Sequence, residues 1–269
     1  MSEFYVPDAD FQEVDKEFRG EDDLLCWAAA SCSALWYSQW VNSSMSWVTA
    51  NNTVSNFQNP TDVFKYTQKY FRNWGGFAFW HMMWMISGSS VGLTTFNNST
   101  FKQEGGGEFY ELTPQETFDY IYCVTPERVL PLFNSWESNY NTNSEKCGVT
   151  VGVRWGASAK APETRQDFAG GHEVSVWGFR YQGSDFNDPR NLTGIQIADP
   201  DDKSNNTRYW LNAQYNTENH LYQLTPSSDP IPEDGLWDKA PSVWVENVTL
   251  IRQKPSNLKH VKNERVAAQ

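Results

Sequence analysis

Three residues of this sequence have the types and the local settings that nucleophilic catalysis requires. Cys26 lies at the start of a predicted helix, where the helix dipole and unpaired backbone N–H groups favour a thiolate. His172 follows two glycines at the start of an alternating segment, and Asp199 ends a later segment of the same kind. A thiolate nucleophile needs a base, and the base needs an acid that orients it. The order Cys, His, Asp therefore predicts a thiol-based nucleophilic site.

The same residues are also consistent with ordinary structural roles. A cysteine in an apolar helical run, such as Cys26, is often a small core residue. His172 could simply begin a strand, and the run from Asp199 to Asp202 reads Asp-Pro-Asp-Asp, a common turn sequence. Asp201 projects to the same side as Asp199 if the chain stays extended between them. The combination of residue types, rather than any one residue, indicates chemistry.

The remaining cysteines and histidines are assigned to structure or left open. Cys32 follows Cys26 by six residues, about 240° around a helix, so it belongs to a different face and is predicted to be structural. Cys123 and Cys147 either form a disulfide or are two free thiols. His81, which lies between large apolar residues, is predicted to be a packing residue. The other two histidines are His220, after a polar loop, and His260, in a basic tail.

No pattern in the sequence indicates a metal or a cofactor. His172 and Glu173 are not part of a His-Glu-x-x-His zinc motif, because the fourth residue after His172 is Val176 and not His. The sequence contains neither a Cys-x-x-Cys pair nor a carboxylate-rich calcium loop. We therefore expect no metal and no cofactor.

Composition and charge exclude several classes of protein. The chain has 269 residues, with 21 Lys and Arg against 33 Asp and Glu, so its formal net charge is -12. Non-specific binding of nucleic acid needs surplus cations, so we expect no nucleic-acid partner. No window of 18 consecutive apolar residues is present, and we expect no membrane-spanning helix. The 4 cysteines are too few for a disulfide scaffold, and the 13 Trp argue against disorder.

Signals for the cellular compartment are weak but point outside the cell. The N-terminus has neither a basic region nor an apolar core, so no signal peptide is predicted in the sequence as given. Asn-x-Ser/Thr sequons are frequent, which favours an extracellular protein whose signal has been removed. They lie at Asn42, Asn51, Asn97, Asn98, Asn191, Asn205 and Asn247.

The elements that must position the candidate residues are helical before Cys147. Helices are predicted over 24–41, 61–73, 114–122 and 126–138, with a buried segment over 77–86 and loops over 1–23, 42–59 and 97–108. Asp22 and Asp23 are predicted to supply the N-cap and the first-turn anions of the first helix. One buried stripe of that helix is predicted to contain Leu25, Ala29, Cys32, Trp36 and Trp40.

After Cys147 the sequence is typical of strands. They are predicted over 147–155, 172–181, 192–199, 207–211, 220–224 and 242–251. Helices followed by strands predict an α+β fold, with a helical first half packed on an antiparallel sheet from the second half. We expect a single domain over 1–269, in which 252–269 is a basic C-terminal tail.

Three motifs of the chain resemble those of one enzyme family. Before Cys26 there is a Lys ten residues earlier, a Phe two residues after that Lys, and the sequence Gly-x-Asp-Asp-Leu-Leu-Cys. His172 is followed by Trp177-Gly178, and Asp199 and Asp201 form an Asp-x-Asp strand end. In these motifs the chain resembles the IdeS/Mac family, the secreted, papain-like endopeptidases of streptococci that cleave immunoglobulin in the hinge region. It departs from that family in having Trp after the cysteine and Gly before the histidine, and the resemblance does not extend to residues 42–145.

The resemblance implies a role for each residue in these motifs. Cys26 would be the nucleophile and His172 its general base and acid. Asp199 would orient His172, and Asp201 would support the site. Lys16 would help to hold the oxyanion together with the backbone N–H of Cys26.

The resemblance also implies a papain-like fold and a secreted virulence factor that serves immune evasion. The activity would be that of a cysteine endopeptidase on an extracellular host protein, with the immunoglobulin hinge as its substrate. An isopeptidase or deubiquitinase with the same residues stays open, as does a non-enzymatic module that binds carbohydrate by aromatic stacking or binds antibody. We expect a monomer whose partner is a protein substrate.

Overall fold

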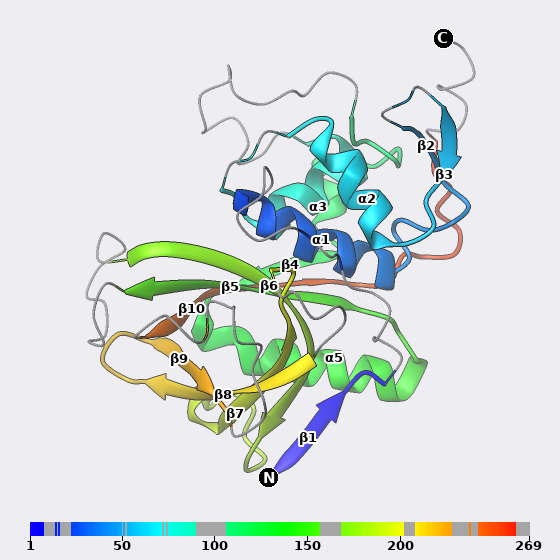
Figure 1. The fold of residues 1–269 in the computed structure, drawn as a ribbon. Coiled ribbons are helices and arrows are strands. Elements are labelled where there is room, and N and C mark those ends of the chain that lie inside the picture. The colour runs from blue at the N-terminus through cyan, green and yellow to red at the C-terminus, as the bar shows by residue number, and fades with distance from the viewer. Residues whose placement is uncertain are drawn as a thin grey trace.

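The structure is a computed structural model in which a layer of helices lies against a strongly curved antiparallel sheet (Figure 1). The residues that it describes are 1–7, 14, 16, 23–49, 51, 53–71, 73, 75–89, 106–156, 168–201, 208–227, 237 and 242–261. Within these residues, no helix has the length and the apolar character needed to cross a bilayer.

The helical layer is built from the first half of the chain. α1 (Cys26–Tyr37) follows a 3-10 turn at Asp23–Leu25 and contains no glycine or proline. α2 (Pro60–Gln68) begins after Asn59, whose side chain accepts a hydrogen bond from a backbone N–H of the first turn at 2.9 Å. α1 packs against both α2 and α3 (Ala78–Ser87). These contacts make α1 the central helix of the layer.

The second half of the chain forms the main sheet. Six strands pair in the order β6, β5, β10, β9, β8, β7, and β7 pairs again with β6, so they close into a barrel. Every pairing among the described strands is antiparallel. The barrel strands are β5 (Gly148–Gly156), β6 (Phe168–Tyr181), β7 (Leu192–Ala198), β8 (Arg208–Asn216), β9 (Leu221–Pro226) and β10 (Val243–Ile251).

Three further elements of the first half attach to the barrel. β1 (Ser2–Tyr5) pairs with β6, and β4 (Ile121–Val124) pairs with β10. α5 (Val129–Asn143) follows a 3-10 turn at Pro126–Arg128 and lies on the side of the sheet opposite α1 (Figure 1). Four side chains of α5 belong to the apolar core of the barrel: Val129, Leu130, Phe133 and Trp136.

The interior of the molecule is divided into two apolar cores. One fills the barrel and its contact with α5. The other joins α1, α2 and α3 and is rich in aromatic rings, among them Trp27, Trp40, Phe57 and Trp84. The helical layer meets the barrel mainly where α1 crosses β5 and β6. Residues at the ends of these elements are therefore placed at the junction of the two cores.

The predicted fold class is confirmed. Helices lie mostly in the first half and pack on an antiparallel sheet built from second-half strands. All six predicted strands are present as β5 to β10, and the buried segment at 77–86 is α3. The predicted helix at 126–138 corresponds to the 3-10 turn and α5.

Some predicted boundaries are wrong. The helices at 24–41 and 61–73 end earlier, at Tyr37 and Gln68. The helix at 114–122 is only α4 (Pro114–Thr117), which opens with a capping box between Thr113 and Glu116. Its predicted second half is strand β4, because the β-favouring run 121–124 pairs with β10.

The predicted loops also contain strands. The loop at 1–23 includes β1, and the loop at 42–59 includes a hairpin of β2 (Ser46–Val48) and β3 (Val54–Asn56). The hairpin is held to α2 by Lys69, whose ammonium group donates to the backbone carbonyl of Thr49 at 3.3 Å. Short strands of this kind lack the long alternation that marks a strand in sequence. Of the loop at 97–108, the structure describes only residues 106–108.

The start of α1 also differs from the prediction. Asp23 lies in the 3-10 turn, Leu25 is the N-cap without a side-chain hydrogen bond, and no acid occupies the first turn. Asp22 lies outside the described residues. The single buried stripe is also wrong, because α2, α3 and the sheet enclose α1 and bury every residue of it except Trp36, which is half-buried.

The first part of the predicted basic tail packs on the body of the protein. Arg252 pairs with Glu145 through Nε at 2.9 Å, and its backbone N–H donates to Tyr120. The backbone N–H of Val261 donates to Phe109 at 2.9 Å. Residues 252–261 are therefore part of the fold, and 262–269 lie outside the described residues.

Candidate active site

Cys26 is the first residue of α1 and is 8 % exposed. Its N-cap residue, Leu25, supplies no side-chain acceptor for the backbone N–H groups of the first turn. The next residue, Trp27, packs edge-on against Phe71 at 5.6 Å and against His81 at 6.0 Å between ring centroids. These contacts fix the first turn of α1 in the apolar core of the helical layer. The Cys26 thiol therefore lies at the edge of that core.

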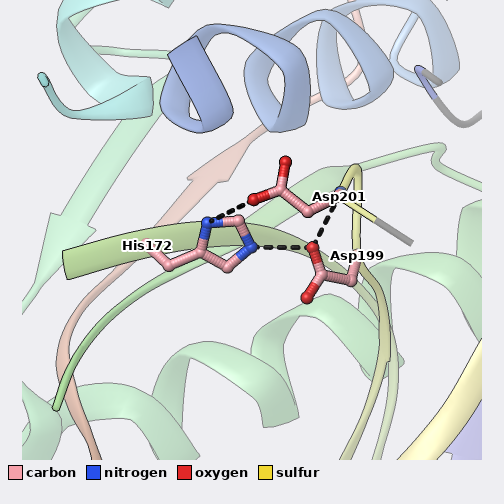
Figure 2. A group of neighbouring side chains, drawn as sticks. All are labelled: His172, Asp199 and Asp201. Atoms are coloured by element: carbon pink, nitrogen blue, oxygen red, sulfur yellow. Dashed lines mark hydrogen bonds and ion pairs between the residues drawn. The ribbon is translucent and has the colours of Figure 1, made fainter. Parts of the chain in front are cut away.

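His172 lies on β6, close to the end of β7. The two strands are paired up to Ser175 and Ala198, so the residues that follow Ala198 run alongside those that precede Ser175. Gly170, two residues before His172, is required because a Cβ there would lie 2.1 Å from the Trp155 ring. The antiparallel register therefore brings Asp199 and Asp201 to His172, as Figure 2 shows.

His172 has a carboxylate beside each ring nitrogen, and only that of Asp199 is close enough for a hydrogen bond. Its Nε2 donates to Asp199 Oδ1 at 2.7 Å, and Nδ1 lies 3.6 Å from Asp201 Oδ2 (Figure 2). The backbone N–H of Asp201 also donates to Asp199 Oδ1, at 2.9 Å. All three side chains are buried or nearly so. The bond to Asp199 fixes the orientation of the ring, and Asp201 lies on the side of α1.

The charges around His172 favour the imidazolium form. Burial acts to lower the pKa of His172, but the charges of Asp199 and Cys26, and hydrogen bonds to both, raise it well above its usual value. Burial acts to raise the pKa of Asp199, and the charge of His172 outweighs it and lowers that pKa. Cys26 and Asp199 thus act on the same ring, and both stabilise its protonated form.

Asp201 joins the histidine to Lys16. The Lys16 ammonium group forms an ion pair with Asp201 Oδ1, and the Lys16 side chain is fully buried. The Lys16 backbone N–H donates to the carbonyl of Pro200 at 3.2 Å, which attaches this part of the chain to the end of β7. Burial raises the pKa of Asp201, and the charges of His172 and Lys16 oppose that effect. The buried cation therefore belongs to the same network as the histidine.

Four of the five candidate residues are joined by these contacts, and the fifth, Cys26, acts on the pKa of His172. The five residues are Cys26, His172, Asp199, Asp201 and Lys16. They come from the start of α1, from β6, from the end of β7 and from residue 16, which precedes α1.

One member of the site was missed. The Trp237 indole Nε1–H donates to Asp199 Oδ2 at 3.0 Å, and the ring is 4 % exposed. Each carboxylate oxygen of Asp199 therefore accepts a hydrogen bond. The buried indole ring of Trp237 shields the hydrogen bond between Asp199 and His172 from water. No spacing in the sequence links Trp237 to Asp199, since 38 residues separate them.

A second missed residue is Glu173, which follows His172. It is 2 % exposed and accepts hydrogen bonds from the Ala78 backbone N–H at 3.0 Å and from the Thr150 hydroxyl at 2.8 Å. Because Ala78 is the first residue of α3, this carboxylate ties the helical layer to the barrel next to the site. Burial raises the pKa of Glu173 to about 7.

The same cluster is the only group in the described chain with the donors for a metal ion. One atom each from His172, Asp199 and Asp201 lie within 4.8 Å of one another. The Lys16 cation already pairs with Asp201 and would repel a metal there. The donor set fits a hydrogen-bonded site better than a metal centre.

The remaining cysteines and histidines lie elsewhere. Cys32 is buried, with its Sγ 3.8 Å from the Thr67 hydroxyl, and His81 is buried between the Thr67 and Ser31 hydroxyls. Both predictions of a structural role fit these positions. Cys123 and Cys147 are free thiols, which resolves the alternative left open by the sequence. The His220 and His260 side chains lie near the surface and contact Tyr215 and Ser44.

A scan against protein-family models and a search of curated proteins each found no match to this chain.

Proposed function

We propose that this chain is a papain-like cysteine endopeptidase in which Cys26 is the nucleophile and His172 the general base and acid. The observation that carries the proposal is the buried His172–Asp199 hydrogen bond of 2.7 Å, with Cys26 acting on the same imidazole. Because Nε2 is bound to Asp199, Nδ1 is the nitrogen that exchanges a proton with the thiol.

The reaction then follows from these positions. The Cys26 sulfur, its proton held by His172, attacks the carbonyl carbon of the peptide bond and forms a tetrahedral oxyanion. His172 gives the proton to the leaving amine as the C–N bond breaks, which leaves a thioester on Cys26. His172 next takes a proton from water, and the hydroxide releases the acid product and restores the thiol. Asp199 stabilises the imidazolium through both steps.

Two donors are available for the oxyanion. One is the backbone N–H of Cys26 at the start of α1, where the helix dipole also favours negative charge. The other is the Lys16 ammonium group, a buried cation that pairs with Asp201 beside His172. In this assignment Asp201 positions the cation, and the cation lowers the energy of the oxyanion.

The proposed substrate and the proposed compartment are based only on the resemblance to the IdeS/Mac motifs. We propose a secreted enzyme that cleaves an extracellular host protein, with the immunoglobulin hinge region as the first substrate to test. Of the sequons, Asn247 is 8 % exposed on β10, so the folded chain does not offer this one for glycosylation.

The nucleophile is tested by alkylation with iodoacetamide at pH 6 followed by peptide mapping. We expect Cys26 to react fastest, because it interacts with His172, the base that can take up its proton. Mapping is needed since Cys123 is exposed to the reagent, although burial raises the pKa of its thiol, whereas Cys32 and Cys147 are buried. Equal labelling of Cys26 and Cys123 at pH 6 contradicts the proposal.

The activity is tested by incubation with a panel of immunoglobulin classes and mass-spectrometric mapping of the fragments. Wild-type protein is expected to produce defined fragments, and the Cys26→Ala variant none. Ubiquitin-linked conjugates in the same panel test isopeptidase activity. Binding of antibody without cleavage would instead favour a binding module.

A further inference from the structure

Arg154 on β5 lies directly beside the strand of the candidate base. Arg154 is paired in register with Gly171, the residue before His172. A Cβ on Gly171 would lie 2.8 Å from Arg154 Nη1 and 3.0 Å from its Cδ, so the arginine side chain lies flat across this glycine. Gly171 is exposed and the Arg154 side chain is 35 % exposed. The guanidinium is thus a surface feature one residue away from His172.

The guanidinium is anchored at one edge only. Arg154 Nε donates to Glu246 Oε2 at 2.6 Å, and the Glu246 side chain is 8 % exposed. Glu246 is the extra residue of a bulge in β10 between Val245 and Asn247, which turns its side chain toward Arg154. Arginine has five N–H donors, and within the described chain both Nη groups of Arg154 have no hydrogen-bond acceptor. The edge that remains is the one that binds carboxylates in a bidentate manner.

The position of Arg154 relative to Cys26 follows from the strand and helix geometry. A Cβ on Gly148 would lie 2.4 Å from the Ala34 carbonyl, so this face of β5 is turned to α1. Alternate residues share a face, which places Arg154 on the same side as α1. β5 and α1 run in opposite directions (Figure 1).

From Gly148 to Arg154 the strand advances about 20 Å. From Ala34 back to Cys26 the helix advances about 12 Å. The strand therefore carries Arg154 past the level of Cys26, the first residue of α1.

We propose that Arg154 is a specificity residue that binds an acidic side chain of the substrate on the leaving-group side of the cleaved bond. The inference rests on the proposed function. His172 must reach the leaving nitrogen to protonate it, so the substrate segment that departs lies against the strand of His172 and its neighbour β5. There the departing segment contacts the Nη groups of Arg154. Because Glu246 already holds the Arg154 side chain in place, binding of the substrate costs less conformational entropy.

The test measures cleavage of quenched fluorescent peptides that differ only after the cleaved bond. Asp, Asn and Lys are placed in turn at each of the first three positions of the leaving segment. Wild-type protein is expected to cleave the Asp peptide at least about tenfold more efficiently than the Lys peptide at one of these positions, mainly through KM. The preference should disappear in Arg154→Gln and reverse in Arg154→Glu.

Two variants serve as controls. Arg180 is also bound to a glutamate through Nε, at 2.7 Å to Glu3, and lies over the Trp210 ring far along β6, so Arg180→Gln should keep the wild-type preference. Arg154→Lys retains the charge without the fork and should keep a weaker preference for Asp.

The outcomes separate this inference from the proposed function. Cleavage with the same preference in wild type and Arg154→Gln overturns the role of Arg154 alone. Failure of the folded wild-type protein to cleave any peptide or immunoglobulin overturns the proposed function and this inference with it. Loss of the preference in both Arg154→Gln and Arg180→Gln also contradicts a local role, because Arg154 lies on β5 beside His172 and Arg180 lies far along β6.

Discussion

The helical layer and the junction with the barrel each contain a buried histidine, and the two have opposite chemistry. In the helical layer, His81 Nδ1 and Nε2 lie 2.8 Å and 2.9 Å from the Ser31 and Thr67 hydroxyls, and burial lowers the pKa of His81 to about 3. At the junction, His172 contacts two carboxylates, and its pKa lies well above the usual value. Burial acts in the same direction on both rings, so the partners decide the outcome.

The two buried cysteines of α1 differ in the same way. Cys32 lies six residues along the helix, fully enclosed beside Thr67, and burial raises the pKa of its thiol. Cys26 lies at the first residue of the same helix, where it interacts with the charged His172. Position on one helix therefore separates a packing thiol from a candidate nucleophile. The helical core supplies neutral hydroxyl partners, and the junction supplies charges.

The largest expected effect tests this contrast directly. Cys26→Ala is expected to lower kcat by more than about 10⁴-fold with little change in folding, because the nucleophile is lost. Peptide hydrolysis and urea unfolding measure the two effects. Cys32→Ala is the matched control and should keep the turnover while losing about 1 kcal/mol of unfolding free energy through a small cavity. Wild-type turnover in Cys26→Ala would end the protease proposal.

Asp199 is expected to have the next largest effect. Asp199→Asn should lower kcat by about 10³–10⁴-fold, because His172 loses both its orientation and the stabiliser of its imidazolium. The pH profile of kcat/KM should also move, since the pKa of His172 falls when the charge of Asp199 is removed. Steady-state kinetics between pH 5 and pH 9 measure both changes.

Asp201 is the comparison for Asp199. Asp201→Asn should cost less, because its nearest oxygen lies 3.6 Å from His172 Nδ1 and the hydrogen bond to Asp199 remains. If Asp201→Asn is the more severe of the two, Asp201 and not Asp199 is the orienting acid.

Lys16 is expected to have a smaller effect on turnover. Lys16→Ala should lower kcat by about 10²–10³-fold, the loss typical of one missing oxyanion donor, with little change in KM. Lys16→Arg should rescue poorly, since a planar fork does not replace a compact ammonium group. Steady-state kinetics on one peptide measure both variants.

The buried partner of Lys16 requires a control. Removal of the cation leaves Asp201 unpaired, which by itself disturbs the site. The double variant Lys16→Met with Asp201→Asn removes both charges and so tests the donor separately. Recovery of wild-type kcat in the double variant would show that Lys16 serves to neutralise Asp201 rather than to hold the oxyanion.

Most of the architecture could be predicted because long periodic segments dominate it. The strands from β5 to β10 and the helices α1, α2, α3 and α5 all have clear patterns in sequence. The short strands β1, β2 and β3 do not, because each has three or four residues and depends on its partner strand. β4 was hidden for a different reason: a true capping box at Thr113 precedes it and suggests a longer helix.

The candidate site could be predicted only as far as sequence motifs reach. Cys26, His172 and Asp199 follow from residue types at element ends, and Lys16 follows from the resemblance alone. Trp237 and Glu173 could not be found this way. Trp237 reaches Asp199 through tertiary structure, and Glu173 is identified by its burial against the first residue of α3. Neither fact has a local signature in the chain.

The smallest expected effect concerns Glu173 and the pH dependence of stability. Its pKa is raised from 4.5 to about 7, so the folded chain binds a proton that the unfolded chain has released over this interval. Its contribution to stability is therefore complete below about pH 4.5 and is lost as the pH rises through 7, by up to about 3 kcal/mol. Glu173→Gln keeps the bonds to Ala78 and Thr150 without a charge. The variant should match wild type near pH 4.5 and be more stable above pH 7, as measured by urea unfolding.

His81 provides the internal reference for this measurement. Its pKa is lowered, so its contribution is complete above pH 6.5 and is lost as the pH falls toward 3, the opposite direction to Glu173. Because Glu173→Gln leaves the helical core untouched, the acid-side loss of stability should be the same in both proteins. The difference between the two curves then isolates the carboxylate that joins α3 to the barrel. Parallel stability curves for wild type and Glu173→Gln over the whole pH range would mean that Glu173 stays ionised in the folded chain. The charges of the site would then affect the pKa of Glu173 more strongly than burial does.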